Sequence, residues 1–132
     1  MNTRIIIISC CLHMLSVACD KPAGEGGQAT ITGKVFVREY DKTFSVKKAE
    51  YYAQAEDVYI IYGNEVSVGN RTRTNYDGTY QFKYMRKGTY KVYAYSKDST
   101  FKSPSGDTEV IQTVNITKPT EEYSVPEIVI LK

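Results

Sequence analysis

Histidine, cysteine and tryptophan are scarce or absent in this chain of 132 residues. It has one histidine, three cysteines and no tryptophan. His13, Cys10 and Cys11 lie within the first 18 residues, so the rest of the chain has no histidine and a single cysteine, Cys19. That remainder can form no intrachain disulfide, and it lacks the usual transition-metal ligands and the usual nucleophile and base pairs.

Carboxylates are the remaining candidates for site chemistry, and no spacing among them singles out a catalytic pair. Asp77, Asp98 and Asp107 could offer oxygens to calcium, but each stands in an ordinary turn context without clustered partners. We therefore expect no enzymatic activity, no metal site and no cofactor.

Neither sign of charge is in excess. The 17 basic residues become 16 if Arg4 is removed with the first 18 residues, against 15 acidic residues. Nothing in this balance points to a nucleic acid partner.

The first 18 residues have the pattern of a secretory signal peptide. Arg4 precedes an apolar run from Ile5 to Val17, and small residues follow it. The run of about 13 residues is shorter than the roughly 20 that a helix needs to cross a bilayer. We expect residues 1–18 to be cleaved off.

The stretch "LSVAC", residues 15–19, resembles a bacterial lipobox of the Bacteroidetes type, with Leu15 four positions before Cys19 rather than the usual three. The resemblance implies that Cys19 carries acyl chains, which would anchor the protein in the bacterial cell envelope, most simply in the outer membrane. The alternative is a secreted protein cut near Ala18, which would leave Cys19 as a free thiol. Residues 19–28 are then a lipidated N-terminus and a flexible linker rich in glycine and charge.

From Ala29 onward the pattern predicts an all-β domain over residues 29–132. Apolar residues alternate with polar ones or form short runs, and turn signals recur about every eight to twelve residues. About seven strands would suit a sandwich of two sheets. The expected strands are 29–39, 56–62, 66–74, 79–85, 89–97, 109–117 and 125–131.

Turn residues suggest how some strands connect. Asp77-Gly78 and Gly88 can adopt the positive φ of tight hairpins, which predicts a meander of strands 66–74, 79–85 and 89–97. Residues 40–56 give no clear strand pattern and could form a short helix or an extra edge strand.

Three stretches carry a family resemblance: "GKVFV" at 33–37, "DVYIIYG" at 57–63 and "TNYDGTYQFKYMRKGTYKVYAYS" at 74–96. They resemble the carboxypeptidase regulatory-like, or transthyretin-like, β-sandwich domains. The resemblance implies that fold but little about function, because such domains are attached to many envelope proteins. The related 5-hydroxyisourate hydrolases use histidines, an arginine and a C-terminal Tyr-Arg-Gly-Ser, which this chain lacks, so a hydrolase remains a remote alternative.

The tyrosines divide by parity, because alternate residues of a strand face opposite sides of a sheet. The family pattern implies that Tyr80, Phe82, Tyr90, Val92 and Ala94 face inward. The residues expected on an outer face, which we regard as a candidate binding face, are Tyr59, Ile61, Lys83, Lys91, Tyr93 and Tyr95.

An outer apolar patch of this size is usually covered or used for binding. Residues 40–55, with Phe44, Val46, Tyr51 and Tyr52, could fold over it as a second small core. Alternatively, the tyrosines could form a platform for a glycan or a protein partner, or could be scattered and without function. "DST" at 98–100 also resembles an O-glycosylation motif and makes Ser99 a candidate for modification.

Two functions agree with these patterns. The first is a lipid-anchored, non-enzymatic binding module for an envelope glycan or protein, and the second is a structural subunit or spacer of an envelope complex. The two differ in whether the outer tyrosines are open to a ligand.

Overall fold

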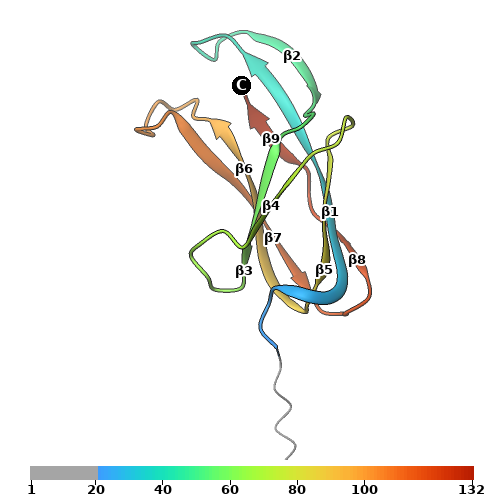
Figure 1. Ribbon diagram of the computed structural model, residues 1–132. Helices are drawn as coiled ribbons and strands as arrows, with labels where there is room; N and C mark the ends of the chain where they lie inside the picture. Colours follow the sequence, from blue (N-terminus) through green and yellow to red (C-terminus); the bar gives the residue numbers. More distant parts are fainter. Residues whose placement is uncertain (1–20) are drawn as a thin grey trace, which may run out of the picture.

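The computed structural model describes residues 21–132 and shows a sandwich of two β-sheets (Figure 1). The predicted signal peptide and Cys19 lie outside the described residues. Within residues 21–132 there is no helix that could span a membrane. The nine strands are β1 (Glu25–Tyr40), β2 (Lys47–Tyr52), β3 (Asp57–Tyr62), β4 (Asn70–Arg73), β5 (Thr79–Met85), β6 (Gly88–Lys97), β7 (Asp107–Ile116), β8 (Glu122–Ser124) and β9 (Ile128–Leu131).

One sheet is built around the long strand β1, which pairs with four other strands. Its first half pairs antiparallel with β5 and parallel with β8. Its second half pairs antiparallel with β2 and parallel with β9. Strand β1 therefore holds this five-stranded sheet together along its full length.

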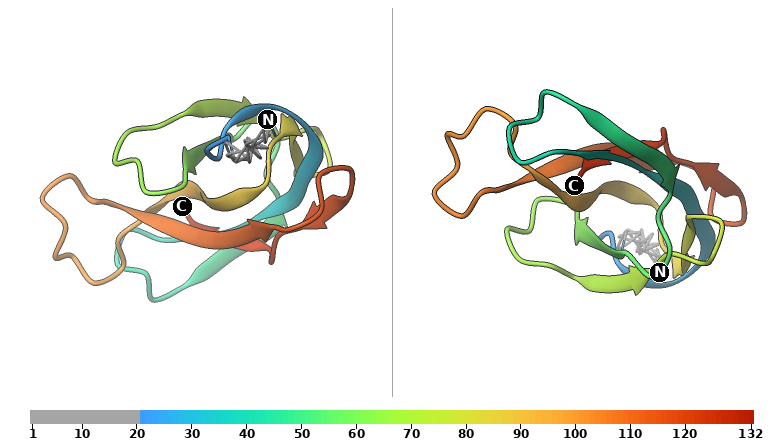
Figure 2. Two further views of the ribbon diagram at one scale, coloured as in Figure 1. Left: turned by 90° about the horizontal axis from the view of Figure 1, so that it is seen from below. Right: turned by 90° about the horizontal axis from the view of Figure 1, so that it is seen from above.

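The other sheet has four strands in the order β4-β3-β6-β7, and all its pairs are antiparallel. Strands β6 and β7 form its longest ladder, from Gly88 opposite Ile116 to Lys97 opposite Asp107. The views along the sandwich show the two sheets facing one another (Figure 2).

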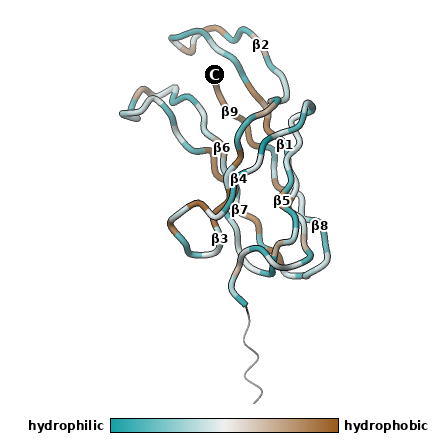
Figure 3. Tube along the Cα trace, in the orientation of Figure 1, coloured by the Kyte–Doolittle hydropathy of each residue, from teal (hydrophilic) through white to brown (hydrophobic). Residues whose placement is uncertain are grey.

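The predicted division of side chains into inward-facing and outward-facing sets is confirmed for the residues of the core. Apolar residues line the space between the sheets (Figure 3). Val58 and Ile60 of β3 are fully buried, and Tyr62 packs against the same core. The residues expected to face inward from β5 and β6 are all buried: Tyr80, Phe82, Tyr90, Val92 and Ala94.

The predicted meander is wrong. Strand β4 pairs with β3, whereas β5 pairs with β1 in the opposite sheet. The turns at Gly78 and Gly88 do have positive φ, of 82° and 144°, but each carries the chain from one sheet to the other. A tight turn fixes the local reversal of the chain without fixing the strands that pair beyond it.

The flexible linker predicted for residues 19–28 is wrong in its second half, because β1 begins at Glu25. Just before the strand, the Gly24 N–H donates to the Tyr90 hydroxyl at 2.8 Å, and Ala23 packs against the core. These contacts fix the chain from Ala23 onward, and the folded domain begins several residues before Ala29.

The undecided segment 40–56 contains an edge strand and no helix. Strand β2 pairs with the end of β1, from Phe36 opposite Tyr52 to Tyr40 opposite Lys47. All six of its residues are exposed, so it lacks the alternation that would reveal a strand in the sequence. Together with β8, it raises the number of strands from the expected seven to nine.

Candidate functional site

The outer face of the four-stranded sheet brings three tyrosines together. Tyr59 of β3 lies directly opposite Tyr93 of β6, and Tyr95 follows two residues later on the same side of β6. The Tyr59 and Tyr93 rings stack at 5.1 Å with 18° between their planes. Tyr95 meets both edge-on, at 5.5 Å from Tyr59 and 5.6 Å from Tyr93. We call these three residues the tyrosine cluster.

The three rings differ in how much of each is open to solvent. Tyr93 is only 6% exposed although it points away from the core, because its neighbours on the sheet cover it. Burial raises the pKa of the Tyr93 hydroxyl to about 12. Tyr95 is 44% exposed and Tyr59 is half-buried. Tyr93 therefore supports a surface that Tyr59 and Tyr95 present.

Apolar and polar side chains border the tyrosine cluster. Ile111 of β7 lies opposite Tyr93 and is 50% exposed, which extends the apolar surface across the sheet. On the other side, Arg73 Nε donates to Asp57 Oδ1 at 2.9 Å. Ile61 and Lys91 form the next row of the same face. The surface is thus a small aromatic and aliphatic area with charged groups at its margin.

Sequence reasoning missed Asp57, Arg73 and Ile111 as members of this face. Once β4 is known to pair with β3, and β7 with β6, the alternation of side chains along each strand places these three residues on the outer face. The missing information was the strand order, which depends on contacts between distant segments.

Residues 40–55 do not cover the tyrosine cluster. Strand β2 pairs with β1 at the edge of the other sheet. The Tyr52 ring packs on Phe36, and the Phe44 ring lies between Tyr40 and Phe101. Val46 and Tyr51 are exposed. The possibility of a second small core formed by this segment is therefore excluded.

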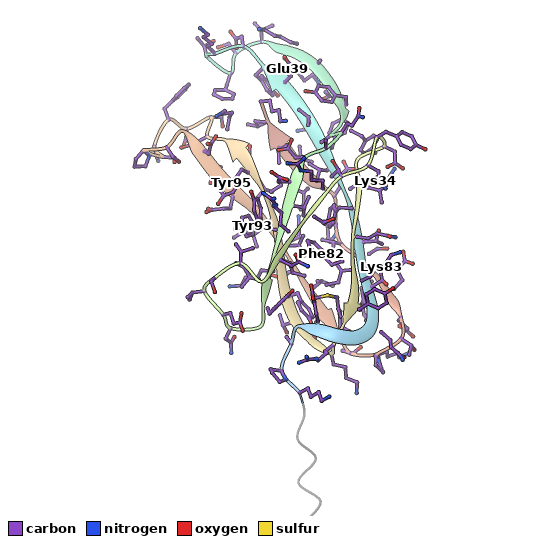
Figure 4. The ribbon with its side chains drawn as sticks, viewed as in Figure 1. Lys34, Glu39, Phe82, Lys83, Tyr93 and Tyr95 are labelled. Carbon is purple, nitrogen blue, oxygen red and sulfur yellow. The ribbon has the colours of Figure 1, made fainter. Side chains whose placement is uncertain are left out.

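Lys83 does not belong to the candidate face. It lies on β5, which pairs with β1, so it is exposed on the outer surface of the five-stranded sheet. Figure 4 shows Lys83 on the opposite side of the sandwich from Tyr93 and Tyr95, with Phe82 between the sheets. The placement of Lys83 on this face is wrong for the same reason as the meander. Strands β5 and β6 belong to different sheets, so their outward side chains do not share a face.

Other residues singled out in the sequence are separate from this face. Ser99 is exposed in the loop that follows β6, as a modification site would need to be, and its glycosylation stays a prediction. The Asp77 carboxylate accepts the Thr79 N–H at 3.1 Å in its own turn. Among the described residues no group of three or more carboxylate, histidine or cysteine side chains is placed to hold a metal ion.

The fold and this face define a β-sandwich with an aromatic cluster on one open sheet surface. No protein-family model matches the chain. No curated protein matches it significantly in sequence. Among solved structures it is similar to a crystal structure from Pseudomonas aeruginosa described as a "putative carbohydrate binding protein", with 11% identity and a TM-score of 0.47 over 83% of this chain and 92% of that one. A similarity of this degree says nothing about the ligand of the present chain.

Proposed function

We propose that this chain is a non-enzymatic, lipid-anchored envelope protein whose sandwich binds a glycan on the tyrosine cluster. The observation that carries the proposal is that Tyr59 and Tyr95 remain open on a sheet face that no other segment of residues 21–132 covers. Tyrosine offers rigid apolar area together with a polar hydroxyl, which suits a sugar ring with an apolar C–H face and hydroxyl edges. Asp57, Arg73 and Lys91 at the margin would meet such hydroxyls.

The support from Tyr93 strengthens this proposal. Because Tyr93 contacts both Tyr59 and Tyr95, which also contact each other, the exposed rings have little freedom to lose when a ligand binds. Binding surfaces gain affinity when their side chains are ordered in advance. A set of independent surface tyrosines would lack this advantage.

The binding proposal can be tested by affinity electrophoresis in gels that contain neutral polysaccharides: a mannan, a xyloglucan and an α-glucan. We expect at least one of them to retard the protein carrying Cys19→Ser. Replacing Tyr59 and Tyr95 together by alanine is expected to weaken retardation at least tenfold, since each ring contributes on the order of 1 kcal/mol.

The matched control replaces Tyr51 and Tyr76, two exposed tyrosines outside the cluster, by alanine. This variant should migrate as the parent does. If the two double variants behave alike, the cluster is not the binding surface. If no glycan retards the parent and the tyrosine cluster instead binds an envelope protein, the module is one for a protein rather than a glycan. If the cluster binds neither, the alternative of a structural subunit is favoured.

The anchoring proposal has its own test. A bacterial lipoprotein is acylated on the cysteine at its cleavage site, so the wild-type chain expressed in a bacterium should incorporate a labelled fatty acid. Cys19→Ser should abolish the labelling and release the protein from the membrane fraction. Persistent labelling of the Cys19→Ser chain would contradict the assignment of this residue, whereas a Cys11→Ser control should be labelled normally.

A further inference from the structure

Two hairpin tips at one end of the sandwich repeat the same four-residue pattern, Asp-x-Thr-Phe. Residues 41–44, Asp-Lys-Thr-Phe, follow β1, and residues 98–101, Asp-Ser-Thr-Phe, follow β6. One tip therefore belongs to each sheet, and in Figure 1 the two tips stand apart at the end of the sandwich opposite the start of β1. We call them the D-x-T-F turns.

The first D-x-T-F turn is closed by the side chain of its aspartate. Asp41 Oδ2 accepts the Thr43 hydroxyl at 2.8 Å, and Oδ1 accepts the Ser45 N–H at 2.8 Å. The Phe44 N–H donates to the Asp41 carbonyl at 3.0 Å. The hydrogen bond from Thr43 is the main cause of the lowered pKa of Asp41.

The second turn repeats this arrangement. Asp98 Oδ1 accepts the Thr100 hydroxyl at 2.6 Å, Oδ2 accepts the Ser103 N–H at 2.7 Å, and the Phe101 N–H donates to the Asp98 carbonyl at 3.3 Å. The same bonds, led by that from Thr100, lower the pKa of Asp98 to about 2. Both carboxylates are thus charged at neutral pH and occupied by donors of their own loops.

The phenylalanines of both turns have a strained backbone. Phe44 has φ of 56° and Phe101 has φ of 57°, a left-handed conformation that disfavours residues with a Cβ atom. Glycine would relieve this strain, and the chain uses glycine at comparable turns such as Gly78 and Gly106. Strain of this kind persists only where the surrounding structure holds it, and it occurs at Ala55 and Tyr84 as well.

The strained backbone brings the two rings together across a groove. Phe44 and Phe101 meet edge-on at 5.6 Å, and Tyr40 lies 6.2 Å from Phe44. Phe101 is nevertheless 69% exposed, so the contact does not bury it. The two D-x-T-F turns and the end of β9 border a groove of about 590 Å³. This volume lies within the range of small-ligand sites.

Lysines outnumber carboxylates among the residues that line this groove. Four lysines line it, namely Lys42, Lys48, Lys97 and Lys132. Lys97 pairs with Asp107 and Lys132 with Glu56, whereas no ion pair within 4.0 Å joins Lys42 or Lys48 to another described residue. The Asp41 and Asp98 carboxylates keep their negative charge, but their oxygens are held by donors of their own loops. Lys42 and Lys48 are held by no ion pair within residues 21–132, so a ligand with negative charge would meet these two side chains.

We infer that this groove is a second ligand site, for a short saccharide that carries carboxylates. Its apolar lining is made of aromatic rings contributed from both sides, which suits the C–H faces of sugar rings better than a flexible acyl chain. Lys42 and Lys48 would meet the carboxylates. The inference is independent of the tyrosine cluster, which lies on an outer sheet face and shares no residue with the groove.

The test titrates the chain carrying Cys19→Ser with trigalacturonate and, as a neutral counterpart, with galactotriose, by isothermal calorimetry at low salt. We expect trigalacturonate to bind at least tenfold more tightly than galactotriose, and its affinity to fall as sodium chloride is added. Lys42→Gln together with Lys48→Gln should remove most of this preference. Lys83→Gln together with Lys87→Gln, which changes the same charge outside the groove, should leave it unchanged.

A second pair of variants tests the aromatic contribution. Phe101→Gly should weaken trigalacturonate binding at least tenfold, while the melting temperature stays constant or rises because glycine adopts this φ without strain. Tyr84→Gly is the matched control, since Tyr84 is also 69% exposed, has φ of 61° and lies outside the groove. It should leave binding unchanged.

Three results would overturn the inference. The first is equal affinity for the acidic and neutral trisaccharides, or no binding of either. The second is unaltered binding in the Lys42 and Lys48 double variant. The third is loss of trigalacturonate binding in the Tyr59 and Tyr95 double variant, which would place the acidic glycan on the tyrosine cluster.

Discussion

Replacing Tyr90 by alanine is expected to lower the free energy of unfolding by about 3 to 5 kcal/mol, the range for large aromatic side chains removed from a core. Tyr90 is fully buried, and its ring meets Tyr62 edge-on at 5.9 Å. Its hydroxyl accepts the Gly24 N–H at 2.8 Å and donates to the Arg86 carbonyl at 2.7 Å. The residue therefore joins the core, the turn before β6 and the chain that leads into β1. Urea denaturation would measure the loss.

The hydroxyl contribution can be isolated with two conservative variants. Tyr90→Phe should cost about 1 to 3 kcal/mol, because the buried Gly24 N–H loses its partner. Tyr80 is equally buried, but its hydroxyl has no hydrogen-bond partner among the described residues, and burial raises the pKa of this group. Tyr80→Phe should thus be neutral or stabilising. Equal losses in the two variants would contradict the role assigned to the Tyr90 hydroxyl.

Gly27→Ala is expected to destabilise the protein by about 3 kcal/mol or more, at the upper end of the range for overpacking. A Cβ atom at Gly27 would overlap with the Met85 carbonyl group and lie 2.7 Å from Arg86 Cα. The pairing of β1 with β5 changes register between Glu25 and Ala29, so the backbones approach closely at this irregularity. Because the obstacle is backbone, no change of side-chain rotamer can relieve it.

Gly106→Ala provides the control for this second prediction. Gly106 has φ of 77°, but a Cβ atom there would have no neighbour within 4 Å. Only the backbone conformation would be penalised, by about 1 to 2 kcal/mol. Urea denaturation of both variants, with hydrogen exchange of the amides near Gly27, would separate steric overlap from conformational strain. A smaller loss at Gly27 than at Gly106 would contradict the close approach of β1 and β5.

The sequence predicts what depends on neighbouring residues. Alternation is a local property, so it places Tyr80 and Tyr90 in the core and Tyr59, Tyr93 and Tyr95 on an outer face. All-β architecture follows from the same pattern. For residues 40–56 the sequence leaves a short helix and an edge strand both open, because no residue of β2 is buried. Only the pairing with β1 makes this segment a strand.

What depends on strand partners could not be predicted. The sequence around Gly78 is compatible with a hairpin, and only the pairing of β5 with β1 moves Lys83 to the opposite side of the sandwich. The deep burial of Tyr93 likewise depends on the stacking with Tyr59 across β3 and β6. The repeated Asp-x-Thr-Phe is visible in the sequence, but the meeting of Phe44 with Phe101 depends on which sheet each hairpin joins.

The hydrogen bond between Gly24 and Tyr90 determines which end of the domain would lie near a membrane. Four residues separate Cys19 from Gly24, a span of roughly 17 Å at full extension. With acyl chains on Cys19, as proposed, the sandwich would be held close to the bilayer by the end at which β1 begins. The D-x-T-F turns lie at the other end (Figure 1), so their groove would face away from the lipid. A short attachment at this end would thus leave the opposite end of the sandwich directed at the surroundings of the membrane.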